Sequence, residues 1–104
     1  MKGPPMLERK RRPSAPGDII RAHYLDERGI SVAALGRAID ISRKHMSDIV
    51  NGHARIEPLV AARLAKVFGT STALWLNLQA AVDAWDADRE VRSWKPPTSF
   101  SDAA

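Results

Sequence analysis

Apolar side chains recur every three to four residues between residues 16 and 90, and no segment of this range alternates steadily between apolar and polar positions. This spacing is typical of amphipathic helices. Breaks in the pattern predict five helices, at about residues 16–28, 32–39, 43–50, 57–68 and 73–90. The predicted fold class is therefore all-α, a five-helix domain.

Residues suited to helix ends mark these boundaries. Ser31 and Ser42 stand directly before two predicted helices, where a hydroxyl can accept a hydrogen bond from a free backbone N–H. One of residues 70–72, all Ser or Thr, is expected to cap the last helix in the same way. Gly29 and Gly69 follow predicted helices and can adopt the positive φ that often ends one.

The inward face of each helix supplies the predicted core. Its members are Ile19, Ile20, Tyr24, Leu25, Leu35, Ile39, Ile41, Met46, Ile49, Leu59, Leu64, Val67, Phe68, Trp75 and Leu78. On the last helix, Trp75 and Leu78 begin a stripe that Val82 and Trp85 continue at helical spacing. The stripe can pack on this domain's own helices or meet a second copy, and we expect the first two residues to be core.

The second and third predicted helices are separated only by Asp40 and Ile41. Gly36 lies where two helices that cross at a steep angle need a small residue. Asp40 occupies a turn position that often prefers glycine, although Asp tolerates the left-handed backbone region better than most residues. This arrangement predicts a helix-turn-helix.

The short third helix has a polar side that points outward once Met46 and Ile49 are buried. In helix-turn-helix proteins, the N-terminal end of this second helix enters the major groove of DNA. Arg paired with guanine is the commonest specific contact, and Lys makes a related one. The predicted base-contacting residues are Ser42, Arg43, Lys44, Ser47 and Asp48, and the predicted phosphate-contacting residues are Arg37, His45, Asn51 and Arg55. A merely solvated polar face is the alternative interpretation.

The net charge of +4 comes from one end of the chain. Residues 1–16 hold five of the 16 basic residues and one of the 12 acidic residues, so the rest is balanced. We expect residues 1–15 to form a basic, disordered arm, residues 16–90 the folded domain, and residues 91–104 a flexible tail. The arm can attract phosphate without reading sequence, or can be simply a solvated tail.

Other classes of function lack the residues they need. The chain has no Cys, which excludes a disulfide framework and a thiol nucleophile, and its three His residues lack the spacing of a metal site. No phosphate-binding loop or catalytic constellation is present, so no enzyme, cofactor or metal is predicted. No apolar run suits a membrane span or a signal peptide, which predicts a cytoplasmic protein.

Three stretches resemble the HigA-type antitoxins, a branch of the phage-repressor-like (XRE/Cro) helix-turn-helix proteins. They are "PGDIIRAHYLDERGIS", "VAALGRAIDISRKHMSDIVNG" and "ARLAKVFGTSTALWLNLQAAVDAW". The resemblance covers roughly residues 15 to 87, and its most specific part is "WLNLQ", which begins the last helix in this family. Two positions depart from the pattern. Ala15 stands where the family often has His, and Val32 stands where phage repressors place a phosphate-contacting Gln, which shifts that role toward Arg37.

The resemblance implies a homodimer that represses its own promoter at a palindromic operator and neutralises a HigB-like, RelE-fold toxin that cleaves mRNA. A dimer also suits the short third helix, because one such helix reads only a few base pairs. Val82 and Trp85 are then candidates for the dimer or toxin interface. The last helix also ends in an acidic patch that suits a basic toxin or is merely solvated, formed by Asp83, Asp86, Asp88 and Glu90. A stand-alone regulator without a toxin and a protein-binding adaptor that never meets DNA are the alternatives.

Overall fold

The computed structural model describes residues 11–101. Within that range the regular structure is entirely helical, which confirms the predicted all-α class. The first predicted helix is an α-helical start that continues as a π-helical segment, and the other four match the predicted helices within one residue. The elements are α1 (Pro16–Ile20), η1 (Arg21–Asp26), α2 (Val32–Ala38), α3 (Arg43–Val50), α4 (Pro58–Phe68) and α5 (Thr72–Glu90).

The helix ends carry the caps that the sequence predicts. The hydroxyls of Ser31, Ser42 and Ser71 each accept a hydrogen bond of 3.0 Å from the backbone N–H three residues later. Gly69 ends α4 with a φ of 72°, and Gly29 follows η1 with a φ of 69°. Local chemistry therefore determines where the helices begin and end.

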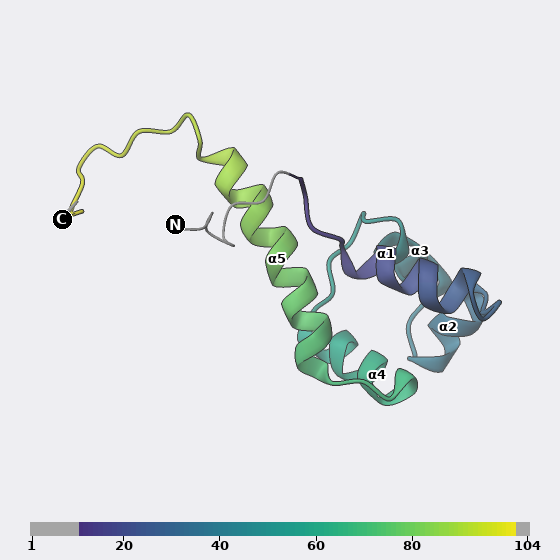
Figure 1. Cartoon of the computed structure of the whole chain (residues 1–104). Helices are drawn as coiled ribbons and strands as arrows, with labels where there is room; N and C mark the ends of the chain where they lie inside the picture. The colour runs from purple at the N-terminus through teal and green to yellow at the C-terminus, as the bar shows by residue number, and fades with distance from the viewer. Residues whose placement is uncertain (1–10, 102–104) are drawn as a thin grey trace, which may run out of the picture.

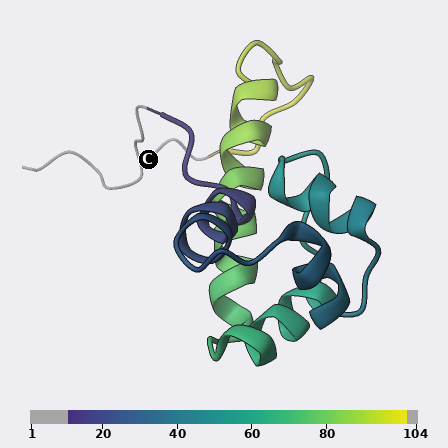
Figure 2. The same cartoon turned by 90° about the vertical axis from the view of Figure 1, so that its right-hand side faces the viewer.

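The helices pack around one core. α2 packs against α3, α1 packs against both α3 and α5, and α4 packs against α5. α5 runs along one side of the shorter helices, and its C-terminal half extends beyond them toward the tail (Figure 1). After a quarter turn, α1 is seen almost end-on in front of α5 (Figure 2). The N-terminal half of α5 therefore closes the core, while its C-terminal half is left more open.

The core combines aliphatic residues of every α-helix with a row of aromatic rings. Trp75 is fully buried, and its indole N–H donates a 2.8 Å hydrogen bond to the hydroxyl of Thr70. The ring of Phe68 lies between those of Trp75 and Tyr24, with centroid distances of 5.7 and 3.6 Å. Leu78 is half-buried and packs against this core, so the prediction for the first half of the α5 stripe is confirmed.

The prediction for α4 was wrong at two positions. Leu59 and Val67 are 63% and 45% exposed, whereas both were expected in the core. The buried side chains of this helix are Val60, Ala61, Leu64 and Ala65. The buried face of α4 is therefore rotated from the predicted one, because Ala61 and Ala65 face the core beside Val60 and Leu64, where Leu59 and Val67 were expected.

α1 approaches the end of α3 unusually closely at Gly17. A Cβ atom at this position would lie 2.6 Å from the carbonyl oxygen of Val50 and would also meet the carbonyl oxygen of Ile49. Both atoms belong to backbone, so neither can turn aside as a flexible side chain would. Gly17 therefore sets the distance between α1 and the helix that is predicted to read DNA.

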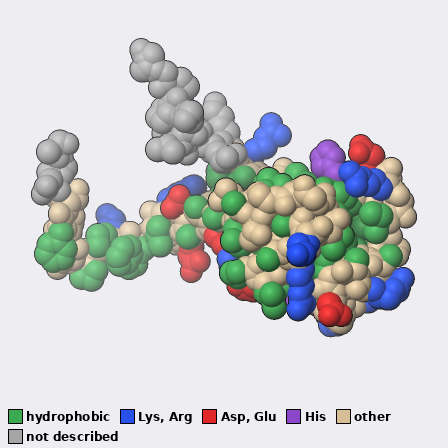
Figure 3. Space-filling view, turned by 90° about the horizontal axis from the view of Figure 1, so that it is seen from below, with side chains coloured by type: hydrophobic (Ala, Val, Ile, Leu, Met, Phe, Trp, Pro, Cys, Tyr) green, Lys and Arg blue, Asp and Glu red, His purple; other side chains and the backbone are tan. Residues whose placement is uncertain are grey.

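The two ends of the chain differ from the body. Residues 1–10 of the predicted arm lie outside the described residues, and so do residues 102–104. α5 ends at Glu90 as predicted, and the segment beyond it carries three exposed apolar side chains, Val91, Trp94 and Phe100. This segment forms a narrow extension from the body (Figure 3). None of the helices in residues 11–101 has the length and apolar character that crossing a membrane requires.

Candidate nucleic-acid interface

The turn between α2 and α3 has the geometry of a helix-turn-helix. Asp40 has a φ of 67°, the left-handed conformation that its position was predicted to need. A Cβ atom on Gly36 would lie 3.1 Å from the carbonyl oxygen of Ile41, so only a very small residue fits there comfortably. The N–H of Ile41 donates a 2.9 Å hydrogen bond to the carbonyl of Gly36. Both predictions about this turn are confirmed.

A side chain of α4 secures the same turn from outside. The guanidinium of Arg63 donates to the carbonyl oxygen of Ile39 at 3.2 Å and to that of Asp40 at 3.4 Å. These carbonyls lie at the end of α2, where a helix leaves acceptors without partners and favours a positive charge. Arg63 was not among the predicted site residues, because nothing local to the helix-turn-helix reveals a bond from a residue 23 or 24 positions later in the chain.

α3 is oriented by its buried side. Met46, Ile49 and Val50 are buried, and the Ser42 hydroxyl caps the N-terminus by accepting from the N–H of His45. A helix of two turns is only marginally stable alone, so these contacts give α3 both its shape and its direction. Its opposite side is therefore left for a partner.

The five predicted base-contacting residues fall into two groups. Ser42, Arg43 and Lys44 are exposed at the N-terminal end of α3, while Ser47 and Asp48 are half-buried one turn later. Lys44 reaches Asp48 with a 3.1 Å ion pair, but the Lys44 side chain is still 85% exposed. The most accessible positive charges of α3 therefore lie at its N-terminus, the end that enters the major groove in this type of motif.

The four predicted phosphate-contacting residues, Arg37, His45, Asn51 and Arg55, are all exposed. Asn51 is held on both sides, since its amide nitrogen donates to Ser47 at 3.2 Å and its oxygen accepts from Arg21 at 2.5 Å. Arg21 therefore adds a positive charge beside the predicted phosphate-contacting residues. The sequence pattern did not identify Arg21, because it lies 30 residues before Asn51 in the chain.

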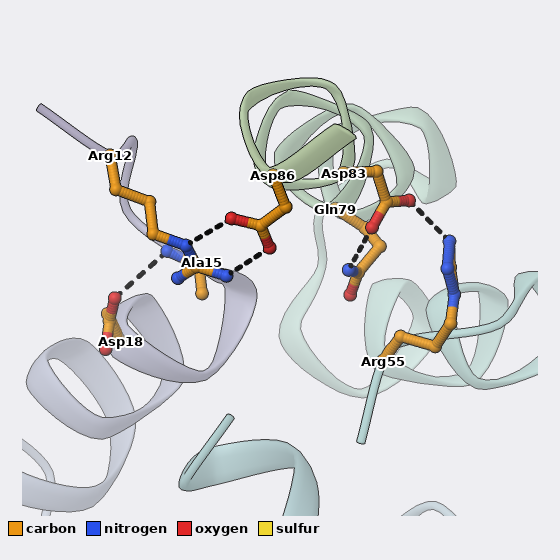
Figure 4. A network of polar contacts seen from close by, with 7 residues as sticks. All are labelled: Arg12, Ala15, Asp18, Arg55, Gln79, Asp83 and Asp86. Carbon is orange, nitrogen blue, oxygen red and sulfur yellow. Dashed lines mark hydrogen bonds and ion pairs between the residues drawn. The ribbon is translucent and has the colours of Figure 1, made fainter. Parts of the chain in front are cut away.

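The loop after α3 is fastened to α5 by a chain of polar contacts (Figure 4). The side-chain oxygen of Gln79 accepts a buried 2.8 Å hydrogen bond from the N–H of Ile56. The amide nitrogen of Gln79 donates to Asp83 at 3.1 Å, and Asp83 accepts from Arg55 at 2.6 Å. Arg55 also meets Glu57 at 3.4 Å. Gln79 gives the "WLNLQ" segment a physical role that the sequence alone did not show.

A second carboxylate of α5 holds the segment before α1 (Figure 4). Arg12 donates from Nε and Nη2 to the two oxygens of Asp86, at 3.0 and 2.9 Å. These hydrogen bonds lower the pKa of the Asp86 carboxyl and raise the pKa of Arg12. Close by, the Asp18 carboxylate accepts a 3.0 Å hydrogen bond from the N–H of Ala15. Part of the predicted arm therefore contacts the folded domain.

The predicted interface residues of α5 have different environments. Val82 is only 4% exposed, so its side chain packs within its own chain and offers little surface to a partner. Trp85 is half-buried one turn later. In the acidic end of the helix, Asp83 and Asp86 are paired with Arg55 and Arg12. Two of the four carboxylates of the predicted acidic patch are thus neutralised from within the molecule.

Comparison with known proteins places this geometry in a family. A family model described as helix-turn-helix matches residues 22–75. The antitoxin HigA-1 of Vibrio cholerae is 38% identical over 81 residues, which cover 78% of this chain and 76% of that protein. An uncharacterized HTH-type transcriptional regulator, YbaQ of Escherichia coli, is 36% identical over 88 residues, covering 85% of this chain and 78% of that protein.

A solved structure agrees with this relationship. The antitoxin HigA of Pseudomonas aeruginosa, determined with the higBA promoter, has a TM-score of 0.71 and 36% sequence identity. The match covers 85% of this chain and all of that one. Sequence and structure therefore agree that the chain belongs to the helix-turn-helix family, in the branch that contains the HigA-type antitoxins.

Proposed function

We propose that this protein is a DNA-binding repressor of its own promoter and the antitoxin of a toxin–antitoxin pair. The observation that carries the proposal is the exposed, capped N-terminus of α3 with Arg43 and Lys44, in a chain similar to an antitoxin solved with its promoter. The protein acts in the cytoplasm as a binding protein rather than an enzyme.

On operator DNA, α3 enters the major groove and two copies read the halves of a palindrome. Arg43 and Lys44 read bases, with Ser42, Ser47 and Asp48 beside them. Arg37, His45, Asn51 and Arg55 contact phosphates and position the protein without reading sequence. Arg21 supports this second group, because its guanidinium is directly bonded to Asn51.

The toxin, an RNA-cleaving protein of the HigB type, is held by a surface separate from α3. Trp85 is the candidate anchor, since it is the half-buried aromatic residue of the open part of α5. Aromatic anchors of this kind often dominate binding energy at protein interfaces. Asp88 and Glu90, exposed nearby, suit a basic partner.

Replacing Arg43 with Ala tests the base-reading role. Binding to the operator is expected to weaken by about 1–3 kcal/mol, while binding to unrelated DNA changes little. Arg89→Ala is the matched control, because it removes the same charge from the far end of α5. An equal loss of affinity for the operator and for unrelated DNA would show that Arg43 contacts phosphates and does not read bases.

A stand-alone regulator is the second candidate, favoured by the relatives named only as transcriptional regulators. Co-expression of this protein with the product of the adjacent reading frame distinguishes the antitoxin from the stand-alone regulator. Growth arrest that this protein relieves, with a stable complex of the two proteins, supports the antitoxin. Operator binding without arrest or complex supports the regulator, and no DNA binding tighter than about 1 μM at moderate salt supports an adaptor.

A further inference from the structure

The guanidinium of Arg55, in the loop after α3, is already occupied by two carboxylates of its own chain. Its Nη2 donates to Asp83 of α5 at 2.6 Å, and its Nε lies 3.4 Å from a carboxylate oxygen of Glu57. Two negative charges thus face one positive charge, so a DNA phosphate that approached Arg55 in this state would meet net repulsion. The phosphate contact predicted for Arg55 therefore requires this side chain to leave its present partners, and the contact with Asp83 is the shorter one.

Asp83 is the fixed member of the pair (Figure 4). Its other carboxylate oxygen accepts a 3.1 Å hydrogen bond from the amide nitrogen of Gln79, whose own oxygen accepts from the buried N–H of Ile56. Arg55 lies in a loop instead, and 49% of its side chain is exposed. A long exposed side chain can change its partner by rotating about its own bonds. An exchange of partners therefore moves Arg55 and leaves Asp83 in place.

The pair lies open beside the helix that is proposed to meet DNA. Arg55 and Asp83 line a cleft of about 550 Å³ between α5 and the loop after α3, and His45 of α3 forms part of the same wall. A second carboxylate in this cleft, that of Asp86, is matched by Arg12 in two hydrogen bonds. Asp83 is thus the carboxylate of α5 that a phosphate must displace from Arg55.

We propose that Asp83 competes with a DNA phosphate for Arg55, so that α5 withholds one phosphate contact of each chain until the ion pair breaks. The inference rests on the proposed DNA binding and assigns to Asp83 a control of its affinity. Phosphates carry no base sequence, so the effect is the same on operator and on unrelated DNA.

This competition gives the proposed toxin surface a route to the DNA-binding face. Asp83 lies two residues before Trp85, the anchor proposed for the toxin, and 44% of the Asp83 side chain is exposed. A basic side chain of the bound toxin that pairs with Asp83 releases Arg55 for DNA. Such coupling is reciprocal, because each ligand then favours binding of the other. Toxin binding is therefore expected to strengthen repression.

The first test compares Asp83→Asn with Asp88→Asn. Asn at position 83 retains an oxygen for Gln79 but loses the charge that holds Arg55. Asp88→Asn is the matched control, because it removes the same charge from the same helix, and Asp88 makes no ion pair within residues 11–101. An exposed ion pair changes an equilibrium constant by about two- to fivefold, so Asp83→Asn should bind operator and unrelated DNA about two- to fivefold more tightly than the control. Fluorescence anisotropy at one fixed salt concentration measures both affinities.

The competition also requires that this difference depend on Arg55. In an Arg55→Gln background the two Asn variants should bind DNA equally, and circular dichroism verifies that each variant retains its helices. A difference that persists without Arg55 would overturn the competition. Equal affinities in the natural background would also overturn it, and weaker binding by Asp83→Asn would show that Asp83 instead positions Arg55 for DNA.

The toxin route is tested with the product of the adjacent reading frame, purified in complex with this protein. The complex should bind operator more tightly than the protein alone, and this gain should be smaller in Asp83→Asn, where Arg55 is already released. No gain, or an equal gain in both proteins, would overturn the route through Asp83. The proposed function fails differently, because the unaltered protein would then bind no operator or form no complex.

Discussion

Gln79 offers a direct measure of how firmly α5 holds the loop that follows α3. Its side-chain oxygen is the acceptor for the N–H of Ile56, and both residues are buried, with 8% and 1% of their surface exposed. Replacing Gln79 with Met keeps the length of the side chain but removes this acceptor. Because both residues are buried at the base of the cleft between α5 and the loop after α3, the Ile56 N–H would lose its partner with little access to water.

The expected cost follows from that orphaned donor. Leaving a buried N–H unsatisfied costs about 1–3 kcal/mol, and the apolar Met tip recovers part of this through its own burial. We therefore expect the free energy of unfolding to fall by about 1–2 kcal/mol. For a domain of this size, each kcal/mol corresponds to roughly 4–8 °C in Tm.

Urea unfolding followed by tryptophan fluorescence, to which the buried Trp75 contributes, measures the total effect, and hydrogen exchange at the Ile56 amide locates it. Asn77→Met is the matched control, because Asn77 is exposed on the same helix. The reasoning is refuted if Gln79→Met costs less than about 0.5 kcal/mol and leaves exchange at Ile56 unchanged.

Three further outcomes follow from the structure. Ser42→Ala removes the cap of α3 and should cost about 1 kcal/mol of stability, measured by thermal unfolding, while Ser42→Asn should retain most of it. Gly17→Ala should destabilise by about 1–3 kcal/mol in urea titrations, because its Cβ would lie 2.6 Å from the Val50 carbonyl oxygen, and this outweighs the better helix propensity of Ala. The lowered pKa of Asp86 means that its pair with Arg12 contributes stability above about pH 4 that is lost as the pH falls through the folded pKa. An NMR titration of the carboxyl carbon should show that pKa, and it should return toward its ordinary value in Arg12→Gln.

The features that were predictable from sequence are those determined within a few residues of chain. Caps such as Ser42 and the left-handed turn at Asp40 depend on local hydrogen bonds and backbone sterics, so residue type reveals them. The exposure of Leu59 was not predictable in this way, since α4 has apolar residues on more than one side. Which of them face the core depends on the shape of α5, and helical spacing alone does not contain that information.

The polar links around α3 were missed for a related reason. Arg12 and Asp86 are 74 residues apart, and Arg55 and Asp83 are 28 apart. Each of these residues has a charged side chain of a type that is common on solvated surfaces, so residue type alone does not reveal its partner. Only the packing of α5 against the rest of the chain brings the partners together. Arg55 was predicted to meet phosphate, and that role stays a prediction beside the contact with Asp83.

These links suggest how orientation and sequence reading are divided in the molecule. α3 is too short to hold its own direction, and it is flanked by three fastened segments: the chain at Arg12, the turn bound by Arg63, and the loop bound by Gln79. None of these three residues lies on the outer side of α3. Changes at Arg63 or Gln79 should therefore weaken binding to all DNA sequences in proportion to the disorder they introduce, whereas a change at Arg43 should alter the ratio between operator and unrelated DNA. Both the affinity and the ratio of operator to unrelated binding can be measured on the same variants. If Gln79→Met is fully folded and still changes that ratio, α5 takes part in reading bases, and the proposed separation of orienting residues from base-reading residues is wrong.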